Sequence, residues 1–92
     1  MQKITLFVQI DYTMDKIRDK NLVKFGQHVK KIRENLNLSQ DQVAANSNLT
    51  KSNISMIESG KRNLAFTTLI ELAKGLGKTP KELLDFKFDL DE

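Results

Sequence analysis

Residues 39–62, SQDQVAANSNLTKSNISMIESGKR, decide the fold of this chain, because they predict two short helices joined by a tight polar break. Ser39 is followed three residues later by glutamine, the pattern of a capping box in which each side chain satisfies a backbone donor at a helix start. Thr50 can cap the next helix, in which Ile54 and Ile57 share one face. We therefore interpret the segment as a helix-turn-helix.

Three further helices are predicted around this unit. Apolar residues recur every three or four positions over residues 21–36, which is typical of an amphipathic helix, and Asn37 can end it in the left-handed conformation. A second apolar face is predicted over residues 66–76. Its members are Phe66, Leu69, Ile70, Leu72, Ala73 and Leu76. Thr79 and Pro80 then supply a cap and a first helical residue for a last short helix.

The start of the chain has a different pattern. Residues 4–10 are rich in β-branched and aromatic side chains and predict a short strand. A lone strand needs a partner, such as the same strand of a second subunit. The alternative is an upstream extension, since Met14 begins a sequence that looks complete without residues 1–13.

The length of 92 residues suits one small domain with an adequate but thin core. We expect an all-α fold of five helices with a short N-terminal extended segment, in which residues 21–86 form the compact unit. Residues 1–20 are then an N-terminal extension, and residues 87–92 are an acidic tail that frays.

The composition excludes several classes of function. The chain has no cysteine, and therefore no disulfide, thiolate metal site or thiol nucleophile. No apolar run approaches the roughly 20 residues that span a bilayer, and the first ten residues lack a basic leader, so we expect a cytoplasmic protein without a membrane partner. His28, the single histidine, has no carboxylate cluster spaced to share a metal with it. We expect no enzyme, no metal and no cofactor.

The distribution of charge is more informative than the net charge of +3. Residues 14–62 carry ten Lys and Arg against five Asp and Glu, whereas residues 81–92 carry two against five. This uneven distribution of charge fits a protein that turns one face to a polyanion. A solvated basic face without a partner would give the same distribution of charged residues.

The second helix of the predicted helix-turn-helix has an outer face suited to base recognition. With the two isoleucines turned inward, helical geometry points the polar residues near its start toward the open side. These residues are Lys51, Ser52, Asn53 and Ser55, with Met56 beside them. Lysine can donate to guanine, asparagine can pair with adenine, and methionine can touch a thymine methyl group. The alternatives are partial core packing for Met56 and a simple solvent contact for Asn53.

Residues on either side of this face could contact phosphates, which fix the register of a protein on DNA without reading its sequence. They are Gln40 before the face, and Lys61, Arg62 and Asn63 after it. Ser39, next to Gln40, is a further candidate DNA contact. A purely solvated turn is the alternative for Lys61 and Arg62.

Residues 22–86 resemble the lambda repressor and Cro family of helix-turn-helix proteins, also called the xenobiotic-response-element family. The similarity is carried, in order, by FGQHVKKIRENLNLSQDQVA, LTKSNISMIESGKRN and TLIELAKGLGKTPKELLDF, and it covers about two-thirds of the chain. Within this family, the segment SNLTKSNISMIESGKRNL is similar to controller proteins of restriction–modification systems.

The resemblance implies roles for individual residues. Gln40 and Asn63 are implied to contact phosphates, and Lys51, Ser52 and Asn53 are implied to contact bases. Arg62 is implied to contact either a base or a phosphate. The resemblance also implies a buried ion pair between Arg33 and Glu58, which would join the first predicted helix to the recognition helix.

We therefore expect a sequence-specific double-stranded DNA-binding protein that regulates transcription. One recognition helix reads only a few base pairs, so we expect a homodimer on a roughly palindromic operator. The expected dimer interface is the apolar surface of the last two helices, with Leu76, Leu83, Leu84 and Phe86. Two alternatives are an antitoxin that also binds a toxin, and a protein-interaction adaptor that keeps the fold without binding DNA. RNA polymerase is a further partner to consider.

Overall fold

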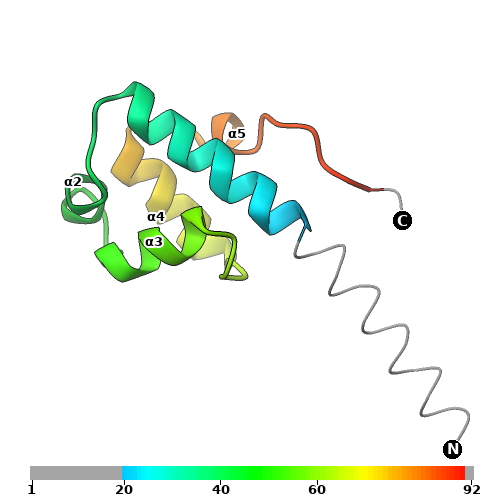
Figure 1. Cartoon of the computed structure of the whole chain (residues 1–92). Helices are drawn as coiled ribbons and strands as arrows, with labels where there is room; N and C mark the ends of the chain where they lie inside the picture. Colours follow the sequence, from blue (N-terminus) through cyan, green and yellow to red (C-terminus); the bar gives the residue numbers. More distant parts are fainter. Residues whose placement is uncertain (1–19, 91–92) are drawn as a thin grey trace, which may run out of the picture.

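The structure, a computed structural model, describes residues 20–90 of the chain. The first helix spans residues 20–35 and runs along the length of the helical bundle (Figure 1). The helices that follow are α2 (Gln40–Ala45), α3 (Lys51–Glu58), α4 (Phe66–Leu76) and α5 (Pro80–Leu83). Within residues 20–90 the chain forms no strand, so the expected all-α fold is confirmed. The strand expected at residues 4–10 lies outside the described residues.

Three helices begin at capping boxes. At the start of α2, Ser39 Oγ accepts the backbone N–H of Gln42 at 3.0 Å, and the side-chain oxygen of Gln42 accepts the N–H of Ser39 at 2.7 Å. Thr50 and Thr79 make the same reciprocal bonds at the starts of α3 and α5. The three predicted caps are therefore confirmed, and each fixes how its helix leaves the preceding loop. Ala65 precedes α4 and supplies no side-chain cap.

The first helix and α3 both end at a residue in the left-handed conformation. Asn37 has a φ of 57°, which confirms its prediction as a helix stop. Gly60 has a φ of 74°, a value that suits glycine because it has no Cβ atom. The backbone N–H of Lys61 then donates to the oxygen of Met56 at 2.9 Å, the bond that closes a Schellman motif. This turn fixes where the chain leaves α3.

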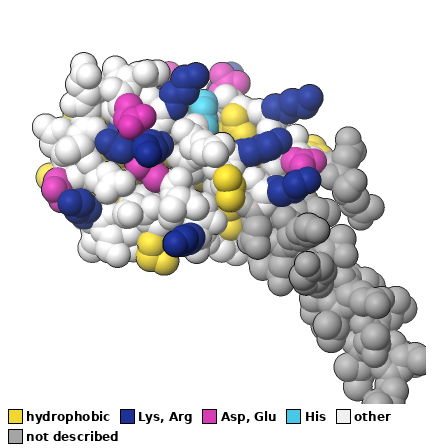
Figure 2. All heavy atoms as spheres, in the orientation of Figure 1, with side chains coloured by type: hydrophobic (Ala, Val, Ile, Leu, Met, Phe, Trp, Pro, Cys, Tyr) yellow, Lys and Arg dark blue, Asp and Glu magenta, His cyan; other side chains and the backbone are white. Residues whose placement is uncertain are grey.

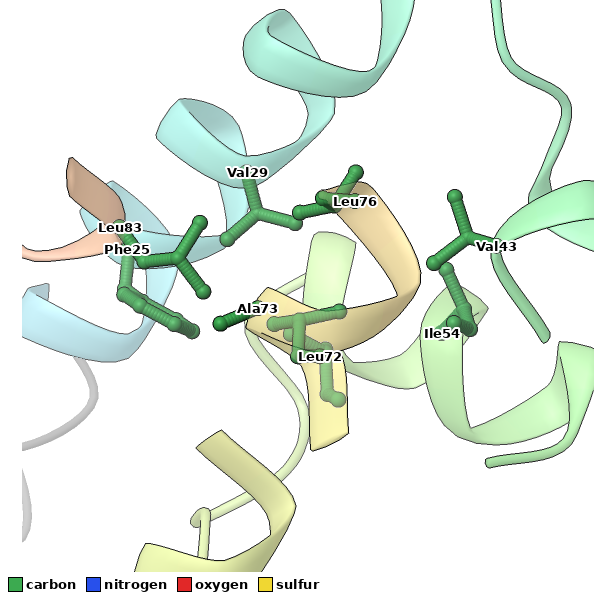
Figure 3. Close-up of a cluster of buried hydrophobic side chains, with 9 residues drawn as sticks. Phe25, Val29, Val43, Ile54, Leu72, Ala73, Leu76 and Leu83 are labelled. Atoms are coloured by element: carbon green, nitrogen blue, oxygen red, sulfur yellow. The ribbon is translucent and has the colours of Figure 1, made fainter. Parts of the chain in front are cut away.

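The core receives side chains from every helix. In Figure 3, Phe25 and Val29 of the first helix point toward residues of α4 and α5, and Val43 of α2 lies beside Ile54 of α3. The buried apolar residues are Phe25, Val29, Val43, Ile54, Ile57, Leu72, Ala73, Leu76 and Leu83. Full burial of one such valine or leucine side chain contributes about 1.5–3 kcal/mol to stability. The core therefore holds the short α2 and α3 in place.

Leu76 and Leu83 belong to this core, although they were predicted to lie at a dimer interface. Their exposed fractions are 4% and 0%, so neither side chain is available to a second protomer, and that prediction is wrong for both. Conversely, Phe66 and Ile70 were predicted on the apolar face of α4 but are 74% and 38% exposed. Helical periodicity identifies an apolar face, but it does not show how much of that face a neighbouring helix covers.

Two glycines allow helices to approach each other closely. A Cβ atom on Gly26 of the first helix would lie 2.6 Å from the backbone oxygen of Glu58, and closer still to that of Ile57. A Cβ atom on Gly75 of α4 would lie 2.6 Å from the backbone oxygen of Val43. Glycine at these positions thus sets the distance of the first helix from α3, and of α4 from α2.

The tail after α5 lies against the first helix. Asn21 Nδ2 donates to the backbone oxygen of Asp89 at 3.0 Å, and the N–H of Asp89 donates to Asn21 Oδ1 at 2.8 Å. Lys20 also forms a salt bridge with the Asp89 carboxylate at 3.0 Å. The rings of Phe86 and Phe88 pack with their centroids 4.4 Å apart. The prediction of a fraying tail is therefore wrong for its described part.

Candidate nucleic-acid interface

Helix α3 presents two different faces. Its inner face is fixed in the core, because Ile54 and Ile57 have exposed fractions of only 0% and 1%. Its outer face carries four exposed residues: Lys51, Ser52, Ser55 and Met56. Met56 is 41% exposed, so part of its side chain is open on the outer face and partial packing against the protein remains compatible with its position. The described part of the chain therefore leaves this polar surface open.

Asn53 differs from the other residues predicted to read bases. It is half-buried, and its Oδ1 accepts the backbone N–H of Thr50 at 3.3 Å in the capping box of α3. Recognition of adenine by asparagine uses the amide oxygen and nitrogen together. The amide oxygen has a second lone pair and the amide nitrogen donates separately, so the predicted pairing of Asn53 with adenine stays a prediction.

Lys51, the first residue of α3, reaches toward α2. Its Nζ lies 3.6 Å from the carboxylate of Asp41, and the two side chains are 61% and 72% exposed. A pair this exposed contributes little to stability, because water screens both charges. The ammonium group therefore remains available to an acceptor from outside the protein.

A buried network joins the end of α3 to the first helix. The Glu58 carboxylate accepts hydrogen bonds from Arg33 Nε at 2.6 Å and from Arg33 Nη2 at 3.0 Å. The side chains of Arg33 and Glu58 are only 12% and 4% exposed, so the predicted ion pair is confirmed. The hydrogen bond with Glu58 raises the pKa of the Arg33 guanidinium. Arg33 Nη1 also donates to the backbone oxygen of Leu38 at 2.8 Å, which ties in the loop before α2.

Gln40 has a different partner from the expected phosphate. Its Nε2 donates to Glu58 Oε1 at 3.0 Å, so the amide points into the buried network. Ser39 is exposed, and its hydroxyl caps α2. The DNA contact of Ser39 and the phosphate contact of Gln40 stay predictions, and a phosphate contact by the Gln40 side chain would require its bond to Glu58 to be exchanged.

The loop after α3 carries the three remaining residues predicted to contact DNA. Lys61 and Asn63 are exposed, whereas Arg62 is half-buried. The Arg62 Nε atom is buried and has no hydrogen-bond partner within residues 20–90. All three residues follow the turn at Gly60 directly, so they lie beyond the C-terminal end of α3.

An apolar groove lies between the start of the first helix, the loop before α4 and the tail. Its volume is about 470 Å³. Its apolar lining consists of Leu22, Phe25, Leu64, Ala65, Phe66, Leu69, Leu84, Phe86 and Phe88. Leu84 and Phe86, which were predicted at a dimer interface, line this groove, and Leu84 is 40% exposed. Sequence reasoning missed Phe66 and Phe88 as surface residues of this groove, since no local pattern marks an apolar side chain that is left uncovered.

The single histidine has a structural position. His28 Nε2 lies 3.0 Å from the backbone oxygen of Glu82, and because a carbonyl only accepts, the nitrogen donates. Its ring lies against Phe86, with centroids 5.5 Å apart. Residues 20–90 contain no group of three or more His, Cys, Asp or Glu side chains that could hold a metal ion. In the same stretch, no helix is both long and apolar enough to cross a membrane.

Charge on the surface is mixed rather than uniform. On the face shown in Figure 2, Lys and Arg side chains are spread among Asp and Glu side chains. Attraction of a polyanion to this face would therefore depend on individually placed cations more than on a single basic patch.

Comparison with known proteins identifies the unit formed by α2 and α3. Residues 29–83 match the family model described as helix-turn-helix. The chain belongs to the helix-turn-helix family. The match includes the whole of α2, α3 and α4, and thus the recognition helix with its buried inner face.

The relatives of this helix-turn-helix protein include control proteins. Control protein C.BamHI of Bacillus amyloliquefaciens is 43% identical over 63 residues, which are 67% of this chain and 78% of that protein. The restriction-modification controller protein C.AhdI of Aeromonas hydrophila matches in structure with a TM-score of 0.67 and 38% identity, over 70% of this chain and 97% of that chain. The controller protein C.Esp1396I, solved as a tetramer with its natural 35 base-pair operator, matches with a TM-score of 0.60 and 35% identity, over 70% and 95% of the two chains. The expected similarity to controller proteins is confirmed.

Proposed function

We propose that this helix-turn-helix protein binds double-stranded DNA sequence-specifically and regulates transcription as a homodimer on a roughly palindromic operator. The observation that carries the proposal is the division of α3 into a buried inner face and an exposed polar outer face. A helix held in this way can enter the major groove without disturbing the core. The similarity to control proteins, one of them solved on its operator, supports the same function.

The proposed contacts divide into base recognition and phosphate binding. Lys51 and Ser52 stand in the first turn of α3, where the exposed side chains and the helix dipole can both approach DNA, and Ser55 follows on the same face. Met56 can contact a thymine methyl group. The proposed phosphate contacts come from Lys61 and Asn63, with Gln40 considered separately below. Arg62 contacts either a base or a phosphate, and Ser39 is a further DNA contact.

The apolar groove is the proposed dimer interface. A symmetric dimer places two recognition helices on half-sites about 34 Å apart, one turn of DNA. Phe66 and Phe88 are 74% and 40% exposed, and Leu84 is 40% exposed, so a second protomer would bury side chains that water now contacts. Leu84 and Phe86 keep the role predicted for them, whereas Leu76 and Leu83 do not.

The proposal includes where the protein acts and what kind of protein it is. We place the protein in the cytoplasm, with DNA as its partner, and regard it as a regulator rather than an enzyme, because the proteins it resembles are control proteins. An antitoxin would bind an operator in the same way but would co-purify with a toxin. RNA polymerase would be a partner if the protein activates its promoter.

Selection of bound duplexes from a random-sequence pool tests the function. We expect enrichment of a consensus with two related half-sites, and a protein-interaction adaptor would enrich none. Lys51→Ala should relax base preference at one position of each half-site by about 1–3 kcal/mol. Lys61→Ala should weaken binding to all sequences alike and reduce the slope of log affinity against log salt.

Two results would contradict the proposal. Absence of any enriched consensus would remove sequence-specific recognition. Equal and uniform losses in the Lys51→Ala and Lys61→Ala variants would show that the division into base-reading and phosphate-binding residues is wrong.

A further inference from the structure

One side chain joins the start of α2 to the end of α3. Gln40 is the first residue of α2 and is half-buried, and its Nε2 lies 3.0 Å from Oε1 of Glu58, the last residue of α3. A carboxylate only accepts hydrogen bonds, so the amide must present its nitrogen. This bond therefore spans the two helices of the helix-turn-helix, in addition to their apolar contacts.

Glu58 depends on such donors because of its position. Its side chain is only 4% exposed, and it stands at the C-terminal end of a helix, where the helix dipole disfavours a negative charge. Arg33 donates one hydrogen bond to each carboxylate oxygen. Gln40 donates a further one to Oε1. The carboxylate thus connects the first helix, α2 and α3 at one buried point.

We propose that Gln40 is a positioning residue for base recognition: through Glu58 it sets the angle at which α3 presents its outer face. As far as DNA is concerned, this inference rests on the proposed function. It differs from the role that the family resemblance implies for Gln40, which is a direct contact with phosphate.

The two roles have different consequences. A phosphate contact contributes to binding of every sequence alike and does nothing for the protein without DNA. A positioning residue stabilises the free protein, and its loss reduces discrimination between sequences more than affinity for DNA in general.

Gln40→Glu separates these roles, because it keeps the shape of the side chain and replaces the donor by a titratable oxygen. The charged groups in the network it faces are Glu58 from α3 and Arg33 from the first helix, and the neighbouring acidic residues are Asp41 and Glu34. At pH 8 two carboxylates would meet and repel each other. Toward pH 5 one proton shared between them restores a hydrogen bond.

Gln42→Glu is the matched control. It is the same substitution on the same helix at an exposed position, and glutamate is accepted at this place in a capping box. We expect the melting temperature of free Gln40→Glu at pH 8 to lie at least about 4 °C below that of the control, and the gap to narrow toward pH 5. The wild-type protein measured alongside gives the reference.

The DNA measurement uses a duplex carrying the consensus selected by the wild-type protein, and an unrelated duplex of the same length. We expect the ratio of the two affinities to fall about tenfold for Gln40→Glu at pH 8, and to stay unchanged for Gln42→Glu. A larger loss on the consensus duplex supports positioning.

Three other outcomes would overturn the inference at different steps. Equal melting of the two variants at both pH values would show that the bond to Glu58 has no effect. A melting difference with equal losses on both duplexes would leave the bond in place but assign Gln40 to phosphate binding. Failure of the wild-type protein to select a consensus would rule out the proposed function, and with it the role of Gln40 in base recognition. The melting curves would still show whether the hydrogen bond between Gln40 and Glu58 stabilises the free protein.

Discussion

Glu58→Ala is the substitution for which the structure gives the clearest magnitude. It removes the acceptor of three hydrogen bonds, two from Arg33 and one from Gln40. The Arg33 guanidinium, only 12% exposed, would keep its bond to Leu38 but would lose its counter-ion. Removing one partner of a buried pair costs about 3–5 kcal/mol. Since the substitution also removes a negative charge from a helix C-terminus, we expect the lower end, about 3 kcal/mol.

Urea or thermal unfolding followed by circular dichroism measures this loss. For a domain of this size, about 3 kcal/mol lowers the melting temperature by about 12–24 °C. Because its pKa is raised, Arg33 contributes its stabilisation at every pH below its already high ordinary pKa. The deficit should therefore be the same at pH 7 and pH 9.

Glu34→Ala is the matched control, because it makes the same change at an exposed position of the first helix. It should alter stability by no more than about 0.5 kcal/mol. A double replacement, Arg33→Met with Glu58→Leu, should recover much of the loss, since no charge is left buried without a partner. A Glu58→Ala protein that unfolds within about 1 kcal/mol of wild type would refute the reasoning.

Three further predictions follow from packing and capping. Gly26→Ala should destabilise the protein, because its Cβ would meet backbone oxygens of α3. If the variant unfolds at the same denaturant concentration as the wild-type protein, the two helices can separate freely and this reasoning is wrong. Leu83→Ala should lower the free energy of unfolding by about 2–5 kcal/mol, because the side chain is 0% exposed. Leu84→Ala should leave monomer stability nearly unchanged but weaken dimerisation, as equilibrium sedimentation can show. If Leu84→Ala were the more destabilising change and Leu83→Ala the one that weakens the dimer, the assignment of the groove would be wrong. The hydrogen bond from the backbone N–H of Thr79 lowers the pKa of Glu82, so this carboxylate contributes stability that is present above its ordinary pKa of 4.5 and lost as pH falls below it. Glu82→Gln should therefore show a smaller drop in melting temperature between neutral and acid pH than the wild-type protein. An equal drop in both proteins would exclude the effect.

Features set by neighbouring residues were predictable from the sequence. The caps at Ser39, Thr50 and Thr79 depend on side chains three residues apart, and the inward side of α3 follows from the spacing of Ile54 and Ile57. These features place the candidate interface, because they define which side of α3 remains open.

Features set by contacts between distant segments were not predictable in the same way. Arg33 and Glu58 are 25 residues apart, and only the family resemblance paired them. The need for glycine at position 26 comes from the backbone of another helix. Leu83 and Leu84 are neighbours of identical chemistry, yet one is in the core and the other is on the surface, because the side that a short helix buries depends on its neighbours.

The close crossing at Gly26 and the carboxylate of Glu58 hold α3 at the same place, its C-terminal end. Lys51, Ser52 and Ser55 take no part in either restraint. If these three side chains read bases as proposed, their exchange would change the target site without requiring compensating stability elsewhere.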